Sequence, residues 1–164
     1  MWTRVVPLRH SLTLIVRPLR HGDVETVRTV FGRLGERSRR ARFNGPKPCL
    51  SLAELEQLAA VDRTHHALVV YAEGDPDPIG IASLVRDGAS AEVAFAVADD
   101  YQHRCVGSVL VDELFAVARA AGISHVTALA ATENRAALAL LRRAADVVDV
   151  RLEGPELSIR AAIA

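Results

Sequence analysis

The stretch Ala91-Glu-Val-Ala-Phe-Ala-Val-Ala-Asp-Asp-Tyr-Gln-His-Arg-Cys-Val-Gly-Ser108 decides how this chain folds. It begins as an apolar strand, continues through a polar loop and ends in the first turn of an amphipathic helix, whose apolar positions include Val109, Leu110 and Leu114. The N–H groups that open a helix have no partner within it and lie at the positive end of its dipole. The stretch therefore predicts a turn whose backbone binds phosphate oxygens.

Turn residues divide the rest of the chain into further strands and helices. Runs rich in apolar and β-branched residues predict strands at residues 12–16, 66–71, 79–85, 92–97, 124–130, 147–152 and 157–163. Helical spacing, capping patterns and a short Arg-rich segment predict helices at residues 23–34, 38–44, 51–60, 109–118 and 134–145. Residues 1–11 are predicted to form an irregular leader.

The order of these elements predicts one α/β domain over residues 1–164. Its mixed central sheet should have about seven strands, with helices on both faces. Asp87-Gly88 is typical of a two-residue hairpin, so the strands before and after it should be antiparallel. Strands 92–97 and 124–130 are joined through a helix and should therefore be parallel.

Composition argues against nucleic-acid binding, membrane insertion and metal binding as the function of this chain. Twenty basic and twenty acidic residues balance, so net charge favours neither nucleic acid nor an anionic membrane. No apolar run is long enough to span a bilayer. Cys49 and Cys105 lie far apart without CxxC spacing, which is typical of a reducing compartment, and we expect a cytoplasmic protein. The pair His65-His66 predicts no metal site, because adjacent strand residues face opposite sides.

Glu92 is an acidic residue near the start of a largely apolar strand. Alternation places it on one face with Ala94 and Ala96, opposite the face of Phe95 and Val97. A partly buried carboxylate with a raised pKa is a suitable base for removing a proton from an amine. The alternative interpretation is an exposed carboxylate at a strand end with no chemical role.

The loop resembles motif A of the GNAT superfamily of acyl-CoA-dependent N-acyltransferases, in which it reads Gln/Arg-x-x-Gly-x-Gly/Ala. Here it reads Gln102-His103-Arg104-Cys105-Val106-Gly107, with Cys105 in place of the first glycine. The resemblance implies acetyl-CoA as co-substrate, its diphosphate held by the backbone from Arg104 to Ser108 and by the charge of Arg104. Glycine suits such a loop because a Cβ crowds the phosphate, or because the backbone needs a positive φ. We expect Cys105 to weaken coenzyme binding without abolishing it.

The sequence around Glu92, residues 91–97 and 100–102, also resembles the GNAT domain of bacterial protein-lysine acetyltransferases. This resemblance extends to Arg17-Pro-Leu-Arg20 and Arg40-Ala-Arg-Phe43 in the N-terminal half. It implies that Glu92, ten positions ahead of Gln102, is the general base, and that Arg42 and Phe43 belong to the acceptor site.

The same resemblance suggests where the acetyl group lies. Acetyl-CoA is expected in the wedge between strands 92–97 and 124–130. Backbone N–H groups near Phe95, Ala96 and Val97 would then polarise the acetyl carbonyl.

Glu133-Asn134-x-x-Ala137 resembles motif B of the family, where the asparagine binds the pantetheine arm or orients the helix. An asparagine before a helical run is also an ordinary N-cap, and both roles stay open. Many members have a tyrosine seven residues after this asparagine as general acid, followed by Gly-Phe. This sequence has Leu141 and Ala145-Asp146 instead, and the protein-lysine enzymes commonly lack the tyrosine too.

The hypothesis is an N-acetyltransferase that moves an acetyl group from acetyl-CoA to a primary amine, preferably a protein lysine. A small-molecule amine is one alternative acceptor. A second alternative is a degenerate module that binds acyl-CoA or a protein partner without turnover, which Cys105, Leu141 and Asp146 favour. We expect no metal, nucleic acid or membrane in the function, and a homodimer stays open.

Overall fold

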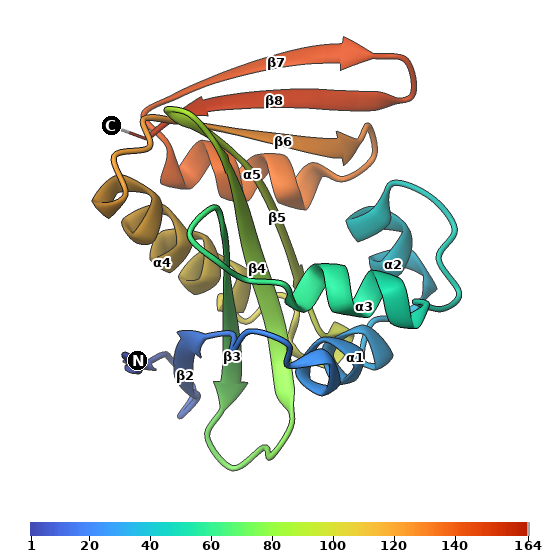
Figure 1. The fold of residues 1–164 in the computed structure, drawn as a ribbon, viewed down its shortest axis with the longest axis vertical. Coiled ribbons are helices and arrows are strands. Elements are labelled where there is room, and N and C mark those ends of the chain that lie inside the picture. Colours follow the sequence, from blue (N-terminus) through green and yellow to red (C-terminus); the bar gives the residue numbers. More distant parts are fainter. Residues whose placement is uncertain (164) are drawn as a thin grey trace.

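The computed structural model describes residues 1–163, and within them eight strands form one sheet in the order β1-β2-β3-β4-β5-β6-β8-β7 (Figure 1). The strands are β1 Arg4–Pro7, β2 Thr13–Pro18, β3 His65–Ala72, β4 Pro78–Asp87, β5 Ser90–Val97, β6 His125–Ala131, β7 Val147–Glu153 and β8 Glu156–Ala162. The helices are α1 Val24–Gly32, α2 Glu36–Phe43, α3 Leu52–Ala59, α4 Val106–Ala120 and α5 Arg135–Ala144, with a 3₁₀ turn at Asp99–Tyr101. The predicted α/β fold with a mixed sheet is confirmed.

Strand β1 was not predicted. It pairs antiparallel with β2, from Arg4 opposite Val16 to Pro7 opposite Thr13, so the expectation of an irregular leader is wrong for these four residues. Only Val6 of the strand is partly buried, and its proline is tolerated because the strand lies at a sheet edge. The strand therefore lacks the apolar alternation by which strands are recognised in a sequence.

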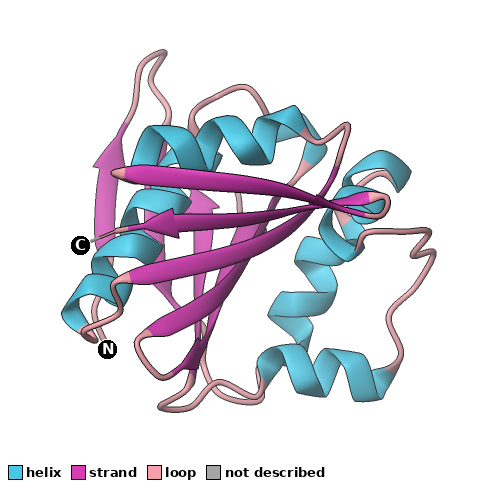
Figure 2. Ribbon diagram, turned by 90° about the horizontal axis from the view of Figure 1, so that it is seen from above, coloured by secondary structure: helices cyan, strands magenta, loops and turns pink. Residues whose placement is uncertain are grey.

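Helices cover both faces of the sheet (Figure 2). The larger core lies between the sheet and helices α4 and α5, and it includes Leu110, Phe115 and Leu141. A smaller core lies on the opposite face, where Val27 of α1 and Leu55 of α3 pack against Val69 of β3. The strands thus alternate between two apolar layers, which explains why their sequences are apolar on both faces.

Strands β5 and β6 are parallel, as predicted, but they pair only from Ser90 to Glu92 with His125 to Thr127. Beyond Glu92 they diverge, while β5 stays paired with β4 along its whole length (Figure 1). One edge of β5 therefore lacks a strand partner over its last residues. The hairpin predicted at Asp87-Gly88 joins β4 to β5, with Asp87 opposite Ser90.

Candidate active site

The loop predicted to bind phosphate runs from Gln102 to Cys105 and enters α4 at Val106. The Val109 N–H donates to the Cys105 carbonyl over 3.2 Å, which begins the helical hydrogen bonding. The amides of Val106, Gly107 and Ser108 come before that bond and have no partner within the helix. With the dipole of a 15-residue helix behind them, these amides are suited to phosphate oxygens.

Cys105 is the N-cap of α4 and has a left-handed backbone, with φ of 66°. Its side chain is exposed and makes no capping hydrogen bond. A left-handed conformation favours glycine because it brings a Cβ close to the backbone. The structure therefore supports backbone conformation as the reason for glycine at this position.

The side chain of Gln102 ties the loop to helix α2. Its Nε2 donates to Ser38 Oγ over 2.9 Å and to the Val97 carbonyl over 3.1 Å. The hydroxyl of Ser38 in turn donates to Asp99 Oδ1 over 2.6 Å. Because these contacts occupy the side-chain NH₂ group and the Gln102 backbone N–H donates to the Asp99 carbonyl over 3.3 Å, Gln102 holds the shape of the loop. Sequence reasoning missed this connection, which joins residues far apart in the chain.

Arg104 is exposed, and its guanidinium lies 5.1 Å from the centre of the Tyr101 ring. The Tyr101 hydroxyl donates to Asp75 Oδ2 over 3.0 Å, and burial together with that bond raises the pKa of Tyr101. Arg33 pairs with both Asp75 and Asp100, at 2.9 and 3.0 Å. This network holds the base of the loop and fixes the Tyr101 ring that the Arg104 guanidinium contacts.

The unpaired edge of β5 offers backbone groups beside the loop. The Ala98 N–H donates to the Ile79 carbonyl of the β4 side over 2.7 Å. Because hydrogen bonding alternates along a strand, the amide of Ala96 also faces β4, whereas those of Phe95 and Val97 face the diverging β6. The predicted acetyl site therefore has two suitably directed amides, and Ala96 is not one of them.

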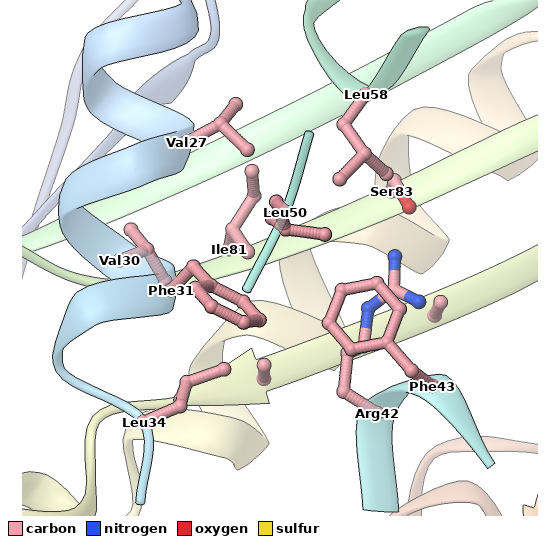
Figure 3. A pocket seen from close by; sticks show the side chains of 12 residues that line it. Val27, Val30, Phe31, Leu34, Arg42, Phe43, Leu50, Leu58, Ile81 and Ser83 are labelled. Carbon is pink, nitrogen blue, oxygen red and sulfur yellow. The ribbon is translucent and has the colours of Figure 1, made fainter. Parts of the chain in front are cut away.

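An open groove of about 530 Å³ lies between helices α2 and α3 and strands β3 to β5. Arg42, Phe43 and Glu92, which the sequence singled out separately, line this groove together. The Glu92 side chain is exposed, so the predicted partial burial is wrong; the groove opens to solvent on this side. A smaller apolar cavity of about 30 Å³ adjoins it (Figure 3), and Phe43 lines both.

His65 and Val85 are groove residues that sequence reasoning did not assign. His65 lies opposite Val85, and Val85 lies opposite Glu92, so the three share one face of the sheet. The sequence predicted that β4 and β5 are antiparallel but not their register, because the two-residue turn lies at Gly88-Ala89, one position later than Asp87-Gly88. The Nδ1 of His65 is 3.1 Å from the Ala60 carbonyl, which requires a proton on that nitrogen.

Comparison with known proteins identifies the family to which this fold belongs. The model of the acetyltransferase (GNAT) family matches residues 36–145. The chain belongs to the GNAT acetyltransferase family. Acetyltransferase Pat of Mycolicibacterium smegmatis is 37% identical over 145 residues, which cover 84% of this chain and 42% of Pat. The chain thus spans less than half the length of this curated relative.

Two solved structures show the same fold. The GNAT domain of PAT from S. lividans has a TM-score of 0.88 and 27% identity, covering 98% of this chain and 97% of that one. PaiA N-acetyltransferase from Thermoplasma acidophilum, in complex with coenzyme A, has a TM-score of 0.65 and 16% identity, covering 91% and 98%. A GNAT fold that binds coenzyme A is therefore among the structural relatives of this chain.

The motif B residues of this GNAT domain have structural roles. Asn134 caps α5, and its Oδ1 accepts a hydrogen bond from the Ala137 N–H over 3.2 Å, as the N-cap interpretation predicted. Leu141 is 1% exposed and belongs to the core, so this position offers no acid for a departing thiolate. Asp146 is exposed after the end of the helix.

Within residues 1–163, no group of three His, Cys, Asp or Glu side chains is placed to hold a metal ion. No helix in this part of the chain is long and apolar enough to cross a bilayer.

Proposed function

We propose that this GNAT domain transfers an acetyl group from acetyl-CoA to a primary amine, with the side chain of a protein lysine as acceptor. One observation carries the proposal: Glu92 lies where β5 and β6 diverge and also lines the groove of Arg42 and Phe43. A candidate base therefore stands between a free strand edge and a cavity that can hold an acceptor.

The residues present fit acetyl-CoA, which supplies an activated thioester when bound. The amides of Val106, Gly107 and Ser108, with Arg104 beside them, would hold its diphosphate. The N–H groups of Phe95 and Val97 face the free edge, where they would stabilise negative charge on the acetyl oxygen.

Glu92 would act on the acceptor. Its carboxylate takes a proton from the ammonium group, directly or through water, because only the neutral amine is a nucleophile. The amine nitrogen then bonds to the acetyl carbon and the carbon–sulfur bond breaks. The proton that the nitrogen loses as the amide forms passes through water to the departing thiolate. The apolar side chains of Phe43 and Leu58 in the groove suit the methylene chain of a lysine.

The test is Glu92→Gln, which keeps the shape of the side chain and removes its basicity. We expect kcat for thiol release to fall by about 10²- to 10⁴-fold, the usual contribution of a general base, with the Kd for acetyl-CoA unchanged by calorimetry. Glu56→Gln, at an exposed position on α3, is the matched control and should leave kcat unchanged. Unchanged turnover in Glu92→Gln would remove this residue from the mechanism.

A second candidate function is a binding module without turnover, which the loss of a phenol at Leu141 favours. Its signature is binding of acetyl-CoA without thiol release on a panel of proteins, peptides and small amines.

A further inference from the structure

Arg42 differs from the other partly buried arginines near the site. Arg33 has two carboxylate partners, and the Nη1 of Arg39 donates to the Pro48 carbonyl over 2.8 Å. Arg42 is half-buried at the end of α2, and within residues 1–163 no carboxylate lies within 4.0 Å of its guanidinium. A guanidinium removed from water without an anion is unfavourable, and burial accordingly lowers its pKa.

The guanidinium of Arg42 is directed into the cavity rather than away from it. Figure 3 shows it extending from α2 beside the ring of Phe43, at 4.9 Å from the ring centre. The guanidinium thus contacts an aromatic face, as arginine side chains commonly do, while Arg42 also lines the groove. Arg42 therefore offers N–H donors suited to a planar anion, and no carboxylate among residues 1–163 is paired with it.

Glu92 supplies the opposite charge in the same groove. Its carboxylate favours the charged form of Arg42, yet the two side chains form no ion pair in the described part of the chain. The groove therefore has a negative group, suited to an ammonium, and a positive group, suited to a carboxylate; its other carboxylate, Glu54, is paired with Lys47. A ligand with both an ammonium and a carboxylate would satisfy both groups.

We propose that Arg42 binds a carboxylate of the acceptor, so that the domain selects amines with an acidic group close to the reacting nitrogen. This inference rests on the proposed function and specifies its substrate class. A carboxylate suits the site better than a phosphate, because Glu92 would repel a dianion more strongly. The carboxylate belongs either to a free amino acid or to an acidic residue beside a lysine.

The test compares matched acceptors that differ in one charge. One pair is a blocked peptide with Glu-Lys and the same peptide with Gln-Lys; the other is lysine and lysine amide. We expect kcat/KM to favour the carboxylate member of at least one pair by about tenfold to a hundredfold, the range for a charge-assisted hydrogen bond. The pair that discriminates identifies the source of the carboxylate.

Substitutions then assign the preference to Arg42. Arg42→Gln should abolish it, Arg42→Lys should keep part of it, and Arg37→Gln, which removes the same charge from an exposed position of α2, should leave it intact. Equal kcat/KM within both pairs, or a preference that survives Arg42→Gln, would overturn the inference and leave acetyl transfer standing.

The failure of acetyl transfer is a separate outcome. If no acceptor is acetylated, the proposed function fails, and calorimetry of the same acceptors with coenzyme-loaded protein then tests the inference. Tighter binding of the carboxylate members, lost in Arg42→Gln, would support it. Equal affinities would overturn it.

Discussion

Cys105 occupies a left-handed backbone position, with φ of 66°, at the entrance to α4. Side chains other than glycine lose about 1–2 kcal/mol in this conformation, whereas glycine loses about 0.5–1 kcal/mol more chain entropy on folding. Cys105→Gly should therefore raise the free energy of unfolding by roughly 0.5–1 kcal/mol. It should also tighten acetyl-CoA binding, because the loop keeps its shape without a Cβ near the phosphate.

Chemical denaturation and calorimetry with acetyl-CoA measure both effects. Cys49→Gly is the matched control: Cys49 is exposed and is not among the residues with positive φ, so its replacement should not stabilise the fold. A Cys105→Gly protein that is less stable, or binds the coenzyme more weakly, would contradict this account of the loop.

For single residues, the sequence indicated those side chains whose residue type alone suggests a chemical or structural role. Glu92 was singled out because a carboxylate is unusual in an apolar strand, and Asn134 because asparagine caps helices. The exposure of Glu92 matches the alternative interpretation rather than the preferred one, since exposure depends on how far α2 and α3 lie from the strand. The contact between Gln102 and Ser38 was not predicted either, because 64 positions separate these residues.

At the element scale, the approach of α4 to the sheet depends on Gly80 of β4. A Cβ built there would lie 3.0 Å from Val70 Cγ1, 3.1 Å from the Ala96 carbonyl oxygen and 3.1 Å from Leu110 Cδ1. Because a backbone atom is among these neighbours, the contact cannot be relieved by a side-chain rotation alone. Gly80→Ala should lower the free energy of unfolding by about 1–3 kcal/mol, as overpacking does.

Gly32→Ala is the control for that change. Gly32 ends α1, and a Cβ there meets nothing within 4 Å, so alanine should be neutral or stabilise by up to about 1 kcal/mol through helix propensity. Denaturation midpoints of the two variants compare the same substitution in a packed and an open position. Equal effects at both would refute the packing role of Gly80.

Elements with a local signal were predicted well. The capping box at Ser51 and Glu54 forms, with the Ser51 N–H donating to Glu54 over 2.8 Å and the Glu54 N–H donating back over 3.2 Å. Strand β1 was missed because its stability comes from pairing with β2. Its own four residues carry no pattern that would predict this pairing. The divergence of β5 from β6 is likewise a property of two elements together.

At the scale of the whole molecule, stability should fall in acid through carboxylates whose pKa is depressed. Hydrogen bonds from the N–H groups of His65 and Thr64 lower the pKa of Asp62 from 3.8 to about 2. Lys47 and the Ser51 cap lower that of Glu54 from 4.5 to about 2. A depressed pKa in the folded state stabilises the fold above the unfolded value, and this contribution is lost as pH falls toward 2.

Asp62→Asn tests this pH dependence. Asparagine keeps an oxygen acceptor for the Thr64 and His65 amides but does not titrate, so the free energy of unfolding should be lower at pH 7 and decline less steeply between pH 5 and pH 2. Asp87→Asn, at the exposed β4–β5 hairpin, should leave the profile unchanged. Parallel acid profiles for wild type and Asp62→Asn would exclude this contribution.

Apart from β1, the order of elements followed from the sequence. So did the parallel pairing of β5 with β6, because a strand–helix–strand unit has one favoured arrangement. The insertion of β8 between β6 and β7 did not, since a hairpin can add to a sheet through either of its strands. The groove that joins Arg42 to Glu92 arises from two helices and three strands, and only the folded chain shows it.

If the amides opening α4 hold the diphosphate of acetyl-CoA despite Cys105, the folded domain binds the coenzyme in the absence of an acceptor. Titration calorimetry with acetyl-CoA measures this binding. We expect one site per chain, weakened by added pyrophosphate, which competes for the same amides. No binding heat at two temperatures, with circular dichroism showing an intact fold, would mean that these amides do not hold the coenzyme.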